Sequence, residues 1–267
     1  MLIECNRLHK DKLLEYVDED FRTCVYLYLN LKEIAFENEN VKVWSDIDSG
    51  SQIHLVVLSY YDCLHLFSRD NLFNKKELLD MIFRILTPHV IFMPEVMLPI
   101  LNDHLIEEYD SNLYSVMTTT KRITDIDTND VTFATLSDME EIANLIISDE
   151  VFSRTYIRDS LAKQMAERYK SGFTRHSILK QKGKIVAHYA TLAESGDLAI
   201  SGLFIVDKLY RGKGYGKKVA THLFKTILNE NKIPILFPAN NGSMQFHKKL
   251  GFNIVGRIAK FTKKNKL

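Results

Sequence analysis

The sequence predicts a mixed α/β protein made of two domains. At 267 residues the chain is long for one domain and comfortable for two. Residues 198–228 contain an apolar stretch of strand character, a glycine-rich turn and apolar residues at helical spacing, in that order. Glycines are unevenly divided, since only Gly50 precedes Gly172. Charge is divided as well: residues 1–124 hold 12 Lys/Arg and 20 Asp/Glu, whereas residues 125–267 hold 23 and 14.

Hydrophobic patterns in the first half predict helices, then a strand meander, then alternating helices and strands. The expected elements are helical pieces over 9–30, strands at 41–44 and 52–67 joined by a turn at 46–50, a helix over 74–86, a strand at 89–93 and a helix over 94–108. Residues 118–130 are polar and rich in Thr and Asp, which indicates a linker. We therefore expect the domains at residues 1–120 and 131–267.

The second half is expected to repeat this order of elements. The expected elements are helices over 137–147 (opened by a capping box at Ser137) and 155–170, a hairpin of 177–181 and 185–193, a strand at 198–206, a helix over 219–228, and strands at 233–237 and 253–261. We expect the final strand to close the sheet of this half.

The glycine-rich turn lies between the strand at 198–206 and the following helix. Three glycines within five residues, Gly212, Gly214 and Gly216, let the backbone approach a ligand closely. The N–H groups of residues 212–217 lie at or before the first helical turn, so they have no intrahelical acceptors, and the helix dipole adds positive charge. Nearby lysines strengthen this field, namely Lys213, Lys217 and Lys218. The turn therefore predicts an anion site, most simply for phosphate.

The spacing of the turn discriminates between phosphate-binding motifs. No Gly-Lys-Ser/Thr is present, which excludes a P-loop, and Val219 stands where a dinucleotide fold needs a third glycine. Instead, Arg211-x-x-Gly214-x-Gly216 resembles the coenzyme A signature of the GNAT acetyltransferase superfamily. A second segment agrees with the family's Asn-x-x-Ala-x-x-Leu-Tyr-x-Lys-x-Gly-Phe element. It reads Asn240-x-x-Ser243-x-x-Phe246-His247-x-Lys249-Leu-Gly251-Phe252.

This resemblance implies a fold, an activity and a cosubstrate. The fold is a central mixed sheet flanked by helices, and the first half resembles a GNAT-like domain that has lost its glycine turn, giving two tandem domains. The activity is acetyl-CoA-dependent transfer of an acetyl group to a primary amine, by direct attack in a ternary complex. The implied coenzyme contacts are Phe204, Ile205, Val206, Arg211, Gly212, Lys213, Gly214, Tyr215, Gly216, Lys217 and Asn240.

The family chemistry assigns roles to several of these positions. Backbone amides at the end of the strand 204–206 polarise the thioester carbonyl, and Gly202 could permit a local bulge there. The side-chain amide of Asn240 corresponds to a group that binds the pantetheine arm, and Ser243 is small enough for that arm to pass.

His247 stands where the family usually has a tyrosine that acts as general acid. An imidazole can also donate a proton near neutral pH, so we predict this role for His247. The alternative is a partly exposed histidine that only fills the tyrosine's space. No general base stands out, because Glu194, Asp197 and Asp207 are expected in solvated turns, and a water chain could serve instead. Three further residues are expected to be structural: His188, Tyr189 and His222.

Composition indicates where the protein is located and whether it binds metals or partners. With 46% hydrophobic and 26% charged residues, no signal peptide and no apolar run of about 20 residues, we expect a cytoplasmic protein without membrane association. Three cysteines without metal-like spacing predict reduced thiols and no metal. The opposite charges of the two halves allow packing between them or a homodimer, and the C-terminal lysines alone do not predict nucleic-acid binding.

The residues leave the acceptor and one alternative function open. Small amines, amino acids, antibiotics and protein N-termini are all compatible acceptors. Because His247 departs from the family and no base is evident, a non-catalytic module that binds coenzyme A as a sensor or scaffold is the second hypothesis.

Overall fold

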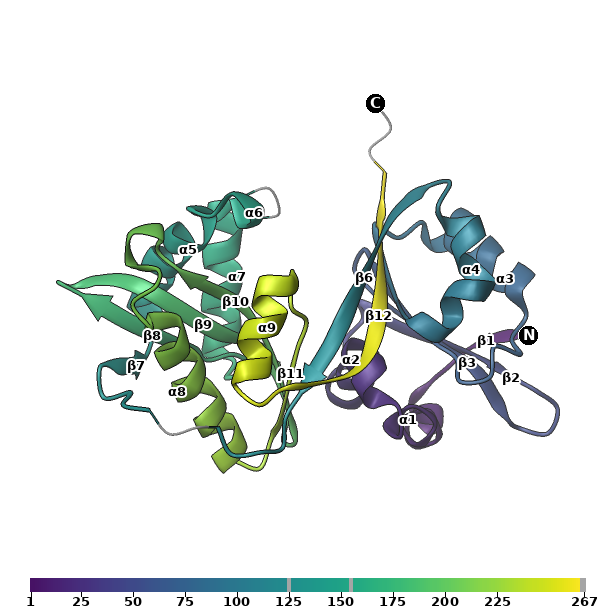
Figure 1. Cartoon of the computed structure of the whole chain (residues 1–267). Coiled ribbons are helices and arrows are strands. Elements are labelled where there is room, and N and C mark those ends of the chain that lie inside the picture. The colour runs from purple at the N-terminus through teal and green to yellow at the C-terminus, as the bar shows by residue number, and fades with distance from the viewer. Residues whose placement is uncertain (124–125, 154–155, 265–267) are drawn as a thin grey trace. The chain divides into compact units, whose positions relative to one another are not determined.

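The computed structural model describes residues 1–123, 126–153 and 156–264, and it has the predicted mixed α/β fold (Figure 1). The chain divides into two compact units. Unit 1 combines Met1–Val116 with the C-terminal stretch that begins at Ile254, and unit 2 is Met117–Asn253. The division differs at the C-terminus from the expected ranges 1–120 and 131–267, because the last strand belongs to unit 1.

Unit 1 is a mixed sheet with helices on both faces. Its elements are β1 (Leu2–Glu4), α1 (Lys10–Asp18), α2 (Val25–Glu33), β2 (Val41–Ile47), β3 (Ile53–Tyr60), β4 (Cys63–Phe67), α3 (Lys75–Asp80, continued by a π-helical turn, Met81–Leu86), β5 (Val90–Pro94), α4 (Leu98–Leu105), β6 (Tyr109–Thr118) and β12 (Asn253–Lys263). The strand order is β1-β2-β3-β4-β5-β12-β6, and β4 pairs with β5 in parallel. The stretch 52–67 is a hairpin, since Tyr61 turns the chain at φ 52°.

Unit 2 is built in the same manner. Its elements are β7 (Val131–Phe133), α5 (Met139–Ile147), α6 (Glu150–Ser153), α7 (Arg158–Lys170), β8 (His176–Gln181), β9 (Lys184–Glu194), β10 (Leu198–Val206), α8 (Tyr215–Asn229), β11 (Ile233–Leu236) and α9 (Asn241–Lys249). The strand order runs from the end of β6 through β11-β10-β9-β8-β7, and β10 pairs with β11 in parallel.

Two expected helix starts differ in detail. The capping box expected at Ser137 is formed by Thr135 and Asp138, because residues 136–138 make a 3-10 turn before α5. The helix expected over 155–170 is described from Arg158 onward, and residue 155 lies outside the described residues.

The order of elements repeats, as the sequence pattern predicted. Each half runs strand, helices, three strands, helix, strand, helix, strand. In each half the third strand of the meander pairs in parallel with the strand after the next helix. Only the second half has glycines between these two parallel strands, at residues 212, 214 and 216.

The last strand of each half pairs outside its own copy of the repeat. β12 lies antiparallel to β5, with Phe261 opposite Ile91, instead of closing the sheet of the second half. Met117 and Thr118, the last two residues of β6, belong to unit 2 and pair there with β11. Burial explains the placement of β12, since Ala259 and Phe261 complete the core of unit 1. Of the expected lysine tail, Lys266 lies outside the described residues.

Two apolar clusters cover opposite faces of the sheet in unit 2. One packs α8 and the end of α9 against Leu179 and Tyr189, and the other packs α5 and α7 against Ile178 and Ile205. Neighbouring residues of a strand face opposite sides, so Ile178 and Leu179 belong to different clusters. The end of β10 therefore presents side chains to both faces.

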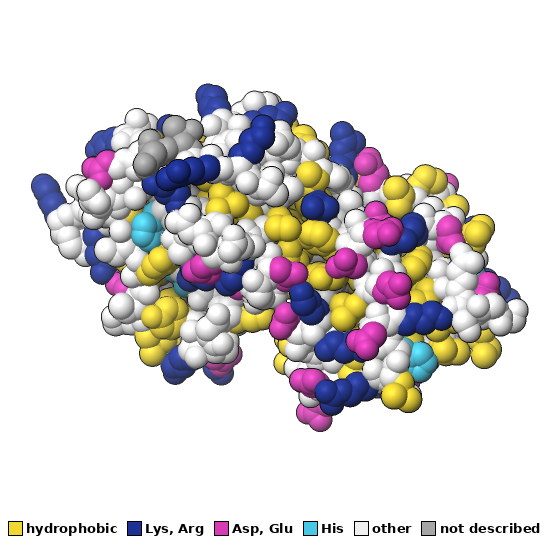
Figure 2. Space-filling view, turned by 90° about the horizontal axis from the view of Figure 1, so that it is seen from below, with side chains coloured by type: hydrophobic (Ala, Val, Ile, Leu, Met, Phe, Trp, Pro, Cys, Tyr) yellow, Lys and Arg dark blue, Asp and Glu magenta, His cyan; other side chains and the backbone are white. Residues whose placement is uncertain are grey.

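Surface charge follows the split in the sequence. In Figure 2, Lys and Arg side chains predominate at the left, over the basic second half, and acidic side chains are more frequent at the right, over the first half. No helix in the described ranges is both long and apolar enough to cross a membrane.

Candidate functional site

The segment Arg211 to Lys217, here called the glycine loop, leads from a 3-10 turn at Lys208–Tyr210 into α8. Gly212 and Gly214 adopt left-handed φ values of 79° and 80°, which glycine reaches without steric cost. The first helical hydrogen bond runs from the N–H of Lys218 to the carbonyl of Gly214, at 3.1 Å. The preceding amides of the first turn therefore have no intrahelical acceptors and are available to an anion.

Gly216 brings α8 into close contact with β10. A Cβ at this position would lie 2.9 Å from Cζ of Phe204 and 3.2 Å from Cγ2 of Val206. Only a residue without a side chain fits this approach. The helix N-terminus is thereby held beside the end of the strand.

Arg211 fastens the glycine loop to two other segments. Its Nε donates to the carbonyl of Val206 at 3.1 Å, and its guanidinium reaches Oδ2 of Asp149 at 3.0 Å. Burial raises the pKa of Asp149, but the hydrogen bonds from Arg211 and from the N–H of Val151, with the charge of Arg211, outweigh burial and lower that pKa below its usual value. The guanidinium is thus engaged by protein groups, and sequence reasoning missed Asp149 because it lies 62 residues away.

The lysines around the glycine loop are not equivalent. Lys218 is bonded to both carboxylate oxygens of Asp130, each at 2.8 Å, so its charge is compensated within the protein. Lys213 lies 4.8 Å above the ring of Tyr210, and neither it nor Lys217 forms an ion pair with a described residue. Of the three lysines expected to supply positive charge to the loop, only Lys213 and Lys217 therefore keep a charge that no described carboxylate neutralises.

β10 continues beyond the end of β11, and its pairing with β9 is interrupted near its end. Its parallel pairing with β11 ends at Ser201, and its register with β9 jumps from Gly202 to Ile205. The bulge expected at Gly202 is therefore present, and Leu203 within it has φ 55°. A Cβ on Gly202 would meet Leu192 at 2.7 Å. In the described sheet, Leu203 and Phe204 have no register partner, as expected for a bulge.

Asn240 caps α9 and keeps its donor free. Its Oδ1 accepts the N–H of Ser243 at 2.9 Å, and its backbone is extended at φ −159°. An asparagine side chain has separate acceptor and donor ends. The capping bond uses the acceptor, so the NH₂ group can face a ligand carbonyl.

His247 is buried on α9, with 2% of its surface exposed. Its Nδ1 lies 2.8 Å from the carbonyl of Ser243, to which it can only donate, and its Nε2 lies 2.7 Å from the hydroxyl of Tyr189. In the neutral ring, Nε2 then accepts a hydrogen bond from the Tyr189 hydroxyl. The ring is surrounded by the aromatic side chains of Phe204, Phe224, Phe246 and Phe252.

This environment keeps His247 neutral. Burial lowers its pKa to about 4, although the bond to Ser243 opposes the shift. In this structure the neutral ring accepts a hydrogen bond from Tyr189, and the proton donation expected from the sequence stays a prediction. Nor is the ring partly exposed, as the alternative interpretation had it.

Comparison with known proteins identifies the domain. The sequence model of the Acetyltransferase (GNAT) family matches residues 139–252. This segment is a GNAT domain. It contains the glycine loop, the bulge of β10 and α9. No curated protein matches the chain.

Solved structures extend the likeness to the whole chain. A GNAT-family acetyltransferase from Colwellia psychrerythraea has 15% identity and a TM-score of 0.61, with 99% of this chain and 100% of that one covered. A Drosophila protein has 12% identity and a TM-score of 0.71, with 98% of each covered. A tandem GNAT protein from the clavulanic acid biosynthesis pathway has 9% identity and a TM-score of 0.58, covering 98% of this chain and 97% of that one. At these identities the likeness concerns the fold.

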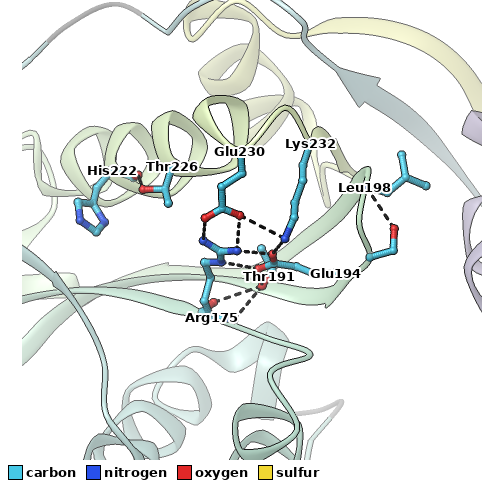
Figure 3. A network of polar contacts seen from close by, with 9 residues as sticks. Arg175, Thr191, Glu194, Leu198, His222, Thr226, Glu230 and Lys232 are labelled. Atoms are coloured by element: carbon cyan, nitrogen blue, oxygen red, sulfur yellow. Dashed lines mark hydrogen bonds and ion pairs between the residues drawn. The ribbon is translucent and has the colours of Figure 1, made fainter. Parts of the chain in front are cut away.

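Glu194 of the GNAT domain is not the solvated turn residue that the sequence suggested. Figure 3 shows Arg175 between the carboxylates of Glu194 and Glu230, with Lys232 beside both. Arg175 binds Glu194 through two nitrogens, at 2.7 and 2.6 Å. Burial raises the pKa of Glu194, but Arg175 and Lys232 outweigh it and keep the carboxylate ionised. This network is fully paired and is structural.

The other carboxylates considered as bases are also engaged. Asp207 accepts the N–H of Leu209 at 3.0 Å and the ammonium of Lys184 at 3.2 Å. Asp197 accepts the hydroxyl of Ser195 at 2.8 Å. Within the described ranges, no group of three or more His, Cys, Asp or Glu side chains could hold a metal ion.

Proposed function

We propose that this protein is an acetyl-CoA-dependent N-acetyltransferase that acts on a primary amine by direct attack in a ternary complex. One observation carries the proposal. β10 has a bulge in which Leu203 and Phe204 have no register partner, and the same strand leads into a helix N-terminus whose first amides have no intrahelical acceptors. An acyl group and a phosphate are the two ends of acetyl-CoA that such donors suit.

Each coenzyme contact then has a chemical role. The amides of Gly212, Lys213, Gly214, Tyr215, Gly216 and Lys217 bind phosphate oxygens, and the ammonium groups of Lys213 and Lys217 add charge. Arg211 holds this loop in place through Val206 and Asp149. The backbone of residues 204–206 and the free NH₂ of Asn240 bind the pantetheine arm and the thioester.

The transfer forms a C–N bond between the amine and the acetyl carbon and breaks the C–S bond of the thioester. Coenzyme A leaves as a thiolate that takes up a proton, and the amine nitrogen loses one. The donors at the bulge stabilise the negative charge that develops on the carbonyl oxygen. The three carboxylates considered as bases are engaged by other groups, so in this proposal water carries the amine proton away.

His247 as general acid stays a prediction. With a pKa of about 4, only about one ring in a thousand is protonated at pH 7. To donate, the ring must also release Tyr189. A water molecule beside the sulfur is the competing proton source.

Coenzyme A binding is proposed for the second half alone. In unit 1 the corresponding helix, α3, already has an anion of its own at its N-terminus. Oδ2 of Asp46 accepts the N–H of Asn74 at 2.8 Å, and Oδ1 of Asp46 holds the N-terminal ammonium at 2.6 Å. Oδ1 of Asn74 caps the N–H of Glu77 at 3.2 Å. A phosphate there would meet the Asp46 carboxylate.

A non-catalytic module that binds coenzyme A is the second candidate. It is favoured by the neutral, enclosed ring of His247 and by the pairing of Glu194 with Arg175 and Lys232. Both candidates share the coenzyme site. They differ only in whether an acetyl group leaves it.

Calorimetry with coenzyme A and thiol release from acetyl-CoA test the two steps separately. We expect one coenzyme per chain, with Gly214→Ala weakening binding at least tenfold, since the alanine is strained at φ 80°. Gly183→Ala is the matched control, because Gly183 has φ 82° and equally open surroundings in the β8–β9 turn. Equal affinities in both variants would contradict the loop assignment.

The activity arm supplies amines of each class to the loaded protein. Small amines, amino acids, amino-group antibiotics and peptides with free N-termini are compared by release of free thiol. Faster release with one class supports the enzyme. Tight binding without release across the panel supports the sensor or scaffold.

A further inference from the structure

Two buried histidines lie beneath the bulge of β10. His188 on β9 has no exposed surface, and His176 on β8 has 2%. Nε2 of His188 and Nδ1 of His176 are 3.0 Å apart, and the rings are stacked with centroids 5.2 Å apart. Nε2 of His176 lies 3.3 Å from the hydroxyl of Thr174. Three nitrogens of the pair therefore have partners.

The fourth nitrogen, Nδ1 of His188, faces the bulge. His188 lies opposite Ile205, and the register then skips Leu203 and Phe204 before Ala190 meets Gly202. Nδ1 is buried and makes no well-aligned hydrogen bond with a described residue. The backbone of Leu203 nevertheless acts on this ring, and it raises the pKa of His188 against the larger lowering by burial and by His176. Nδ1 of His188 therefore points towards the bulge.

The proton positions follow from the partners. Burial lowers the pKa of His176 to about 4, and no carboxylate shifts the pKa of either ring, so both rings are neutral near pH 7. If the hydroxyl of Thr174 donates to His176, the Nδ1–H of His176 donates to His188. The remaining proton then sits on Nδ1 of His188 and can be donated to the carbonyl of Leu203.

The bulge requires such a support. Leu203 holds a left-handed φ of 55°, which for a residue with a Cβ costs on the order of 1–2 kcal/mol. The segment has no register partner on β9 or β11 in the described sheet. A trans peptide directs its carbonyl and its N–H in opposite directions. A carbonyl of Leu203 held towards β9 therefore turns the N–H of Phe204 towards the side where β11 has already ended.

We propose that the His176–His188 pair positions the bulge of β10 so that the N–H of Phe204 is aimed at the acetyl carbonyl of bound acetyl-CoA. The inference rests on the proposed function. The two histidines are positioning residues, because they act through the backbone of Leu203 and not on the substrate.

The test compares His188→Leu with His188→Gln, using carbonyl-labelled acetyl-CoA as the probe. The infrared stretch of the bound thioester carbonyl reports its polarisation without any turnover. In the wild type we expect the stretch to shift to lower frequency than in free acetyl-CoA. His188→Leu should lose most of this shift and lower kcat for thiol release about tenfold or more, with KM within about twofold. His188→Gln retains a donor and should recover part of both.

Controls separate the outcomes. His222→Leu removes a half-buried histidine that bonds Ser177 and does not touch the bulge, so it should leave the stretch unchanged. If His188→Leu does not fold, His176→Phe removes the partner hydrogen bond with little change in volume and should reduce the shift. A wild-type shift that persists unchanged in the folded histidine variants overturns the inference and leaves the function standing. A shift that depends on His188, without any transfer to amines, overturns the function and leaves the positioning role.

Discussion

Nε2 of His247 accepts a hydrogen bond from the hydroxyl of Tyr189, 2.7 Å away, inside an aromatic cluster. The bond joins α9 to β9 through two residues that lie 58 positions apart in the chain. It satisfies two polar groups that burial would otherwise leave unpaired. For His247 to act as the predicted general acid, this bond must open.

His247→Phe is predicted to lower the free energy of unfolding by about 1–3 kcal/mol, because the Tyr189 hydroxyl loses its buried acceptor. The double variant with Tyr189→Phe should recover much of this loss. Urea unfolding measures both. If His247 is instead the general acid, His247→Ala should lower kcat roughly a hundredfold with unchanged coenzyme affinity, and His247→Tyr should stay active. Wild-type turnover in His247→Ala would exclude that role.

Gly216→Ala is predicted to weaken coenzyme A binding and to lower stability by about 1–3 kcal/mol, because its Cβ pushes into the Phe204 ring. Gly196→Ala is the control variant, since it adds the same methyl group at a place where a Cβ meets nothing within 4 Å. Calorimetry and thermal unfolding report the two effects. An unaltered affinity in Gly216→Ala would mean that α8 need not approach β10 so closely.

Lys213→Ala and Lys217→Ala are each predicted to weaken coenzyme A binding about three- to tenfold at low salt, and less at high salt, because their charges are uncompensated. Lys218→Ala should change the affinity less, since Asp130 already neutralises Lys218. Calorimetry at two salt concentrations measures the difference. Equal losses for all three lysines would contradict the assignment.

Acid is predicted to destabilise the protein through its buried neutral histidines. The folded pKa values of His247 and His176 are about 4, below the ordinary value near 6.5. Between these values the unfolded chain binds more protons, so stability is present above pH 6.5 and falls as the pH drops towards 4. The slope is about 1.4 kcal/mol per pH unit for each such histidine. Unfolding of His247→Phe at pH 7, 6 and 5 should show a shallower slope than the wild type.

Phe261→Ala is predicted to destabilise unit 1, although Phe261 follows the GNAT segment in the chain. The residue is fully buried among side chains of β3, β4 and β5, and such truncations cost about 3–5 kcal/mol. Phe252→Ala is the matched variant, with 1% exposure in the core of unit 2. Hydrogen exchange should quicken in peptides of β3 to β5 for the first and of β9 to β10 for the second. The opposite pattern would contradict the pairing of β12 with β5.

Local signals explain what could be predicted from the sequence. The strand Leu198–Val206, the glycine loop and the cap at Asn240 depend on neighbouring residues, through backbone freedom, helix ends and side-chain capping. The repeated order of elements follows from hydrophobic periodicity. These features predicted the coenzyme motif and the α/β class.

Long-range partners decided the rest. Whether Lys218 or Arg211 is free depends on Asp130 and Asp149, and the protonation of His247 depends on Tyr189. The strand expected to close the second half pairs with β5 instead. The sequence could not predict this pairing, because the apolar residues of the strand fit either sheet by pattern alone. The sequence by itself therefore determined the elements and the glycine loop, because these follow from contacts within a few residues. Only the tertiary structure decided which charges are free and which strands pair, because burial and electrostatic pairing join residues far apart in the chain.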